Sequence, residues 1–157
     1  MTLFEVFDWL ELTFIGSAIR DSLWLFPVVE AVHLLALAML GGAVLVVDLR
    51  LLGLGLTRRS PAYLLEQARS WQVGSIVLLV ATGVPLLLSE AVKLYFSPPF
   101  WWKMGFLLAA LVFTFGVRNR VVSRQLDLAV WQARGIAMTS IGLWFSVAAA
   151  GRWIGFS

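Results

Sequence analysis

A glutamate and the only histidine of the chain lie three residues apart in the apolar run PVVEAVHLL, residues 27–35. On a helix, Glu30 and His33 share one face and lie about one turn apart. A charged side chain in an apolar helix loses several kcal/mol of hydration, so it needs a partner or a task. Carboxylates and imidazoles relay protons, and a neutral imidazole binds haem iron. The pair is therefore a candidate for proton transfer, for metal binding through His33, or for a structural ion pair.

Three further ionisable residues, Glu90, Lys103 and Arg152, lie near one end of later apolar stretches. At 1.5 Å per helical residue, Glu30 and Glu90 lie at matched depths of about 8 to 9 Å, with His33 at about 12 Å. We therefore expect Glu30 and Glu90 to meet Lys103 and Arg152 inside a bundle, with His33 beneath them. The same residues also admit a structural interpretation, as an ion network that holds helix ends together.

Small and charged residues continue this helical face toward the other end of the first stretch. Steps of three or four residues lead from His33 to Gly41 and on to Asp48. Gly41, with Gly42 beside it, would let a second backbone or a flat ligand approach closely. Asp48 and Arg50 close the face at the far end. The face therefore offers a slot for a planar ligand below His33.

The composition indicates that the surrounding solvent is a lipid bilayer. The chain has 157 residues, of which 61% are hydrophobic and 13% charged, and its mean hydropathy is +0.90. Soluble domains carry about twice this charged fraction. The net charge of +3 arises from short basic blocks without a base-stacking or groove-reading motif, so nucleic acid is not expected as a partner. The absence of cysteine excludes disulfides, thiolate metal sites and cysteine nucleophiles.

Four apolar stretches are each long enough to cross about 30 Å of hydrocarbon. The sequence therefore predicts an all-α fold, a single membrane domain over residues 1–157 built as an antiparallel four-helix bundle. A capping box, Thr2-Leu3-Phe4-Glu5, starts a short amphipathic helix over residues 2–18 that would lie in the interface. Ser60 and Pro61 predict a second helix start, and Pro85 predicts a kink. The spans are expected at about 25–47, 73–96, 100–117 and 135–156.

Basic residues in the connections predict the orientation of the bundle. Two connections, 48–72 and 118–134, each hold four arginines, which is eight of the twelve basic residues. Because short cytoplasmic loops are enriched in Lys and Arg, these connections are expected on the cytoplasmic side and both termini outside. The arginines are Arg50, Arg58, Arg59 and Arg69, then Arg118, Arg120, Arg124 and Arg134.

The run EAVHLLALAMLGG (residues 30–42), DLRLLG at the end of that stretch and the later FWWKM resemble an uncharacterised bacterial membrane family. That family is grouped near the CopD-like copper-resistance membrane domains. The resemblance covers most of the chain and implies a multi-pass protein of the bacterial inner membrane. It also suggests copper passage, for which one histidine, no cysteine and scattered methionines form a poor path.

A looser similarity extends to the HemJ-type protoporphyrinogen oxidases, which are also small four-span proteins. Their first span carries a histidine, a glycine about ten residues on and an arginine near its inner end, which here correspond to His33, Gly42 and Arg50. A lysine after a tryptophan in their third span corresponds to Lys103. The resemblance implies that these residues bind haem or porphyrin. This chain differs in its acidic N-terminus and in one extra residue between the histidine and the arginine.

Three functions follow as hypotheses, and the sequence leaves open whether the protein is an enzyme. The leading one is a redox protein that binds haem b or another porphyrin, with His33 on the metal. The alternatives are a proton-coupled transporter or ion pathway that titrates Glu30, Glu90 and His33, and a non-catalytic membrane subunit or assembly factor. Besides the lipid bilayer, a homo-oligomer or a membrane complex is the expected partner. The cofactor-binding residues would be Glu30, His33, Gly41, Gly42, Arg50, Glu90, Lys103 and Arg152.

Overall fold

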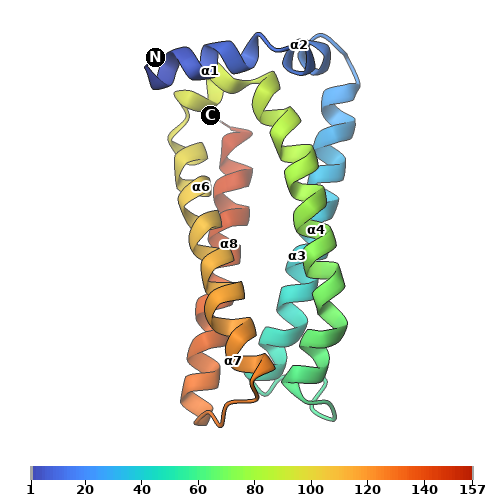
Figure 1. Ribbon diagram of the computed structural model, residues 1–157, viewed down its shortest axis with the longest axis vertical. Coiled ribbons are helices and arrows are strands. Elements are labelled where there is room, and N and C mark those ends of the chain that lie inside the picture. The colour runs from blue at the N-terminus through green and yellow to red at the C-terminus, as the bar shows by residue number, and fades with distance from the viewer. Residues whose placement is uncertain (1, 157) are drawn as a thin grey trace.

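The computed structural model describes residues 2–156, and all regular elements in this part of the chain are helices, with no strand. Four helices are long and apolar enough to cross a membrane, and they stand side by side in alternating directions (Figure 1). Their outward faces expose large apolar side chains such as Val77, Leu108 and Phe145, as expected for contact with lipid. The protein is therefore a multi-pass membrane protein of the predicted all-α class. These helices cover Leu25–Leu51, Pro61–Ser89, Pro98–Ser123 and Val130–Ile154.

The helix boundaries follow local capping chemistry. The first span is α3 (Leu25–Leu51), and the second is α4 (Pro61–Ser89), which begins where the Ser60 hydroxyl accepts a hydrogen bond from the amide of Tyr63. The helix start predicted at Ser60 and Pro61 leads without a break into the second span. Between α3 and α4 the chain turns through Gly53 and Gly55, whose φ angles of 81° and 64° favour glycine.

The third span is a composite helix, and the fourth is a single one. α6 (Pro98–Leu111) leads into a π-helix, η1 (Val112–Arg118), and then into α7 (Asn119–Ser123). α8 (Val130–Ile154) forms the fourth span. In a π-helix each hydrogen bond spans five residues along the chain, whereas in an α-helix it spans four. The π-helix therefore changes which side chains of the third span face the bundle interior.

The four spans pack as two pairs. α3 lies along α4, α6 lies along α8, and contacts between α3 and α8 join the pairs. α4 meets the third span mainly at α7, so the upper parts of α4 and α6 stand apart (Figure 1). The central apolar core is formed by Leu40, Val44, Ala110, Trp144 and Val147.

The N-terminal segment crosses the end of the bundle at which both chain ends lie, here called the terminal end (Figure 1). The predicted capping box is present, with Thr2 N–H donating to Glu5 Oε2 at 2.8 Å and Glu5 N–H donating to Thr2 Oγ1 at 3.3 Å. The single helix expected over residues 2–18 is instead two, α1 (Leu3–Glu11) and α2 (Phe14–Arg20). The break occurs because Thr13 caps the second helix by accepting from the amide of Gly16.

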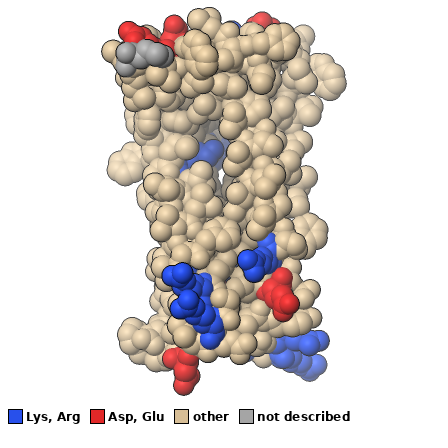
Figure 2. All heavy atoms as spheres, viewed as in Figure 1, with Lys and Arg blue, Asp and Glu red and all other residues tan. Residues whose placement is uncertain are grey.

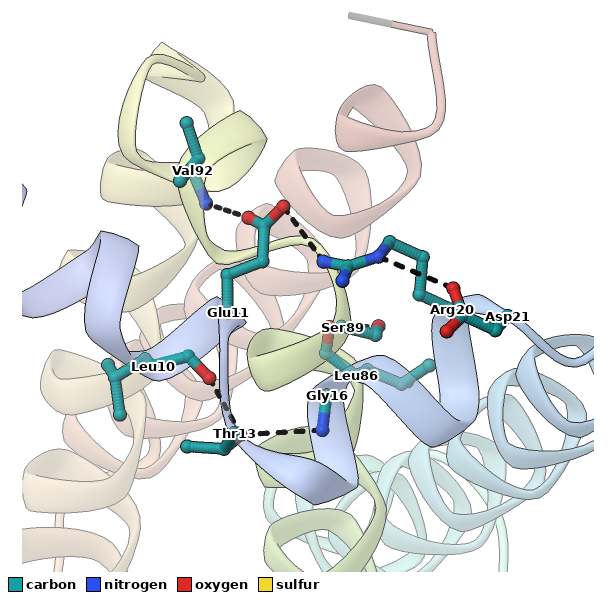
Figure 3. A network of polar contacts seen from close by, with 9 residues as sticks. All are labelled: Leu10, Glu11, Thr13, Gly16, Arg20, Asp21, Leu86, Ser89 and Val92. Carbon is teal, nitrogen blue, oxygen red and sulfur yellow. Dashed lines mark hydrogen bonds and ion pairs between the residues drawn. The ribbon is translucent and has the colours of Figure 1, made fainter.

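A polar clamp joins these two helices to each other and to the segment that follows the second span (Figure 3). Glu11 accepts a hydrogen bond from the amide of Val92 at 2.6 Å and forms an ion pair with Arg20 at 3.0 Å. Val92 lies in the first turn of α5 (Ala91–Tyr95), so Glu11 satisfies an amide that a helix start leaves without an internal partner. α4 continues past Pro85 and ends before Glu90, whose φ of −134° is not helical. The interruption of the second span therefore lies five residues beyond the proline.

Candidate functional site

His33 lies half-buried on the side of α3 that faces α4. Its Nδ1 is 2.8 Å from the hydroxyl oxygen of Thr82, and that hydroxyl donates to the carbonyl of Leu78 at 2.7 Å. Since the hydroxyl proton is directed to Leu78, the arrangement matches the neutral tautomer in which His33 Nδ1 donates to the Thr82 oxygen. Nε2 then carries a lone pair that can bind a metal or accept a proton.

Two glycines make room beside His33 and Lys103. A Cβ on Gly83 would lie 3.1 Å from Cε1 of His33, and a Cβ on Gly151 would lie 3.7 Å from Nζ of Lys103. Both ionisable side chains therefore rest on bare backbone of the neighbouring helix.

Lys103 is a half-buried cation without a protein partner. Among residues 2–156, its ammonium forms no hydrogen bond or ion pair, although it is close enough to His33 for their charges to interact. Figure 2 shows a hollow in the upper half of the molecule with basic side-chain atoms inside it. His33 and Lys103 thus form the part of the predicted site that the fold brings together.

The other predicted members of the ion cluster lie elsewhere, so the expected cluster does not form. Glu30 is exposed and has no ion pair or hydrogen bond with the described residues. It is turned away because the buried face of α3 runs through Ala36 and Leu40. Glu90 sits at the interruption after α4 and pairs with Lys93 at 3.4 Å. Arg152 is exposed, with its guanidinium 4.7 Å from the ring centre of Phe156.

Gly41 and Gly42, which were expected to border a flat ligand, are not packed against a neighbouring helix. A Cβ on Gly41 or Gly42 would meet no neighbouring atom within 4 Å, and Gly42 is exposed. These glycines lie on an open part of α3. Arg50 donates from Nε to the carbonyl of Arg59 at 2.6 Å, so it fixes the turn between the first two spans.

A fully buried ion pair, which the sequence did not predict, joins the first and third spans. Arg118 Nε lies 2.6 Å from Asp48 Oδ1, and both side chains are 0% exposed. The guanidinium also donates to the carbonyl of Val44 and to the side chain of Asn119, both at 2.7 Å. The sequence predicts a cytoplasmic connection for Arg118, because the apolar stretch of the third span ends just before it. Arg118 is the last residue of the π-helix η1, which no residue pattern in the sequence predicts.

A hydrogen-bonded chain extends this pair to α4. Asn119 Nδ2 donates to Gln72 Oε1 at 3.1 Å, and Gln72 Nε2 donates to the carbonyl of Ala43 at 3.3 Å. Ser140 of α8 lies beside Asp48, although its hydroxyl has no hydrogen-bond partner in the described part of the chain. Asp48 Oδ2 and the hydroxyl of Ser75 are likewise buried without a partner there. All four spans therefore contribute polar groups to the half of the bundle away from the terminal end.

Neither polar region is a preformed metal cage. No group of three or more His, Asp or Glu side chains that could hold a metal ion occurs within residues 2–156. A metal bound by His33 would therefore need its remaining ligands from a macrocycle, from water or from another chain.

Comparison with known proteins places the chain in a family. No curated protein and no solved structure matches it. The resemblance to an uncharacterised family agrees with the family match described next, whereas no link to CopD-like or HemJ-type proteins is shown. A family model described as a family of unknown function, DUF6644, matches residues 6–157. The four-span bundle with its His33–Lys103 site and buried Asp48–Arg118 pair thus belongs to the DUF6644 family.

Proposed function

We propose that this membrane protein binds haem b or another porphyrin in a redox role, with His33 as an axial ligand and Lys103 as the partner of a propionate. The observation that carries the proposal is the fixed ring of His33. Its Nδ1 is engaged by Thr82, which leaves Nε2 as a ligand for iron. Bound haem would supply one-electron chemistry at its iron.

The surroundings of His33 fit such a ligand. Lys103 is a half-buried cation without a hydrogen-bond or ion-pair partner among residues 2–156, so a propionate would compensate its charge. Gly83 and Gly151 present backbone without side chains next to the two residues. With one histidine in the chain, the sixth ligand would be methionine, water or His33 of a second copy, and the last case requires a homo-oligomer.

An absorption spectrum of protein purified gently from haem-replete cells tests the proposal. We expect a Soret band in the wild type, its loss in His33→Ala and weaker haem retention in Lys103→Gln. Glu30→Gln is the matched control, since it changes an ionisable residue one turn from His33 that lies outside the site. Protein that is colourless and takes up no added haemin would contradict haem binding.

A second candidate function, a proton-coupled transporter or ion pathway, is favoured by the unpartnered buried atoms. Asp48, Ser75 and Ser140 come from three spans, and each has a buried oxygen without a partner in the described chain. Such oxygens can hold water or a proton in transit. Flux in proteoliposomes should then fall in Asp48→Asn and stay unchanged in Asp127→Asn, which lies in an exposed connection. Equal flux in both variants and the wild type would remove this candidate.

The proposed location is the bacterial inner membrane, with both termini outside. This proposal is supported by the arginines gathered at the end of the bundle opposite the termini, because short cytoplasmic loops are enriched in Lys and Arg.

A further inference from the structure

A pocket of about 730 Å³ lies at the end of the bundle opposite the terminal end, between the start of α4 and the end of the third span. Three arginines line it, Arg69 from α4, Arg120 from α7 and Arg124 just beyond α7. Figure 2 shows basic side chains gathered near this end of the molecule. The pocket is separate from His33, which lies nearer the terminal end of α3.

The charges in this pocket are not balanced by the protein. Within residues 2–156, the guanidinium groups of Arg69, Arg120 and Arg124 form no hydrogen bond or ion pair. Glu66 is the acidic residue of the lining, and it too has no ion-pair partner in that range. Three unpaired cations therefore share one concave surface with a single carboxylate. Such a surface attracts an anion, and guanidinium forks match phosphate oxygens in geometry.

The apolar part of the lining indicates which kind of anion fits. Leu65 and Phe115 border the same pocket as the arginines. Phe115 belongs to the π-helix of the third span and is exposed on the surface that meets lipid. A ligand with a phosphate beside a hydrocarbon chain would satisfy both parts at once. Basic pockets between membrane helices are suited to the head groups of anionic lipids.

We propose that the pocket formed by Arg69, Arg120 and Arg124 binds the phosphate head group of an anionic phospholipid from the leaflet at this end of the bundle. The acyl chains then run along Phe115 and the outer face of the third span. Asn119 also lines the pocket, and its side chain bonds to Arg118 and Gln72. A bound head group therefore stabilises α7 against α4 at the edge of the buried polar chain. This inference is independent of the cofactor proposed for His33.

Native mass spectrometry of the full chain in neutral detergent tests the inference, with phosphatidylglycerol, phosphatidylcholine or inorganic phosphate added. We expect retained phosphatidylglycerol and little phosphatidylcholine. The double variant Arg120→Gln/Arg124→Gln should weaken phosphatidylglycerol binding roughly 30-fold, because each arginine near an anionic lipid contributes about 5-fold. The matched control is Arg134→Gln, an exposed arginine near the start of α8 that does not line the pocket.

A variant that is expected to bind the lipid more tightly shows that weaker binding in the double variant is not caused by loss of folding. Glu66→Gln removes the repelling carboxylate and should tighten binding about 5-fold. The inference would be overturned by equal retention of the two lipids or by equal losses in the Arg134→Gln and double variants. Displacement of the lipid by millimolar inorganic phosphate would also overturn it, since the pocket would then recognise a free anion.

Discussion

The ion pair between Asp48 and Arg118 joins the first and third spans through two fully buried side chains. Burying two charges costs several kcal/mol of hydration each, which their attraction and additional hydrogen bonds must offset. Arg118 supplies such bonds to Val44 and Asn119, so its charge is well compensated. Removing one partner leaves the other as an uncompensated charge in an apolar interior.

We therefore predict that Asp48→Leu lowers the free energy of unfolding by about 3 to 5 kcal/mol. The double variant Asp48→Leu/Arg118→Met removes both charges and should recover most of this loss. Denaturant titration in detergent micelles, followed by tryptophan fluorescence, measures both values. A single variant as stable as the double one would mean that the pair is not coupled.

Thr82 is the residue that fixes the ring of His33, through the 2.8 Å contact with Nδ1. Thr82→Val keeps the shape of the side chain but removes the acceptor, so the ring loses its orientation. If His33 binds haem iron, affinity for haem should fall about 10- to 100-fold. Thr139→Val on the exposed face of α8 makes the same chemical change outside the site and should leave the affinity unaltered.

Residue types identified His33 and Lys103 as unusual, and the structure brings these two near each other. The sequence could not place Glu30, because the direction of a side chain near a helix end depends on how the helices tilt against one another. Arg118 was missed for a related reason. An arginine at the end of an apolar stretch reads as a topology signal until the path of the helix is known.

At the scale of elements, the contact between α2 and α4 depends on a glycine. Gly16 is buried, and a Cβ at this position would collide with the carbonyl oxygen of Leu88. The close approach brings Arg20 into reach of Glu11 and so completes the clamp. Of these features, the helix starts at Thr2 and Ser60 were predictable from capping residues. The break at Thr13 follows the same capping chemistry, whereas no residue pattern indicates the π-helix.

Gly16→Ala should therefore lift α2 from α4 and destabilise the protein by about 1 to 3 kcal/mol, the usual cost of overpacking. Limited proteolysis should then cut between α1 and α2, at sites protected in the wild type. Gly142→Ala is the control, because a Cβ there meets nothing within 4 Å. As a glycine-to-alanine change inside a helix, the control should be neutral or should stabilise by about 0.5 to 1 kcal/mol. Similar protease resistance in all three proteins would refute the proposed role of Gly16.

At the scale of the whole molecule, the four spans require that both termini lie on one side, and Figure 1 shows them at one end. That this side is the outside follows from the arginines of the two connections at the opposite end, which are expected in the cytoplasm. In the cysteine-free chain, Ser60→Cys and Ser123→Cys should react with a membrane-impermeant maleimide only after the cells are opened. Leu23→Cys, 97% exposed before α3, should react in intact cells. The reverse labelling pattern would show that both termini lie in the cytoplasm.

If His33 binds the proposed ligand, the N-terminal helices that cross the terminal end also limit the route by which that ligand arrives. That end is covered by α1 and α2, and the hollow in the upper half of the molecule opens sideways (Figure 2). A ligand on this route must first dissolve in the bilayer, so its effective concentration is its mole fraction in lipid and not its concentration in the buffer. Apparent affinity should therefore weaken in proportion as lipid is added at constant total ligand. The protein would then sample a two-dimensional pool, whose exchange with water sets the rate at which each molecule is loaded.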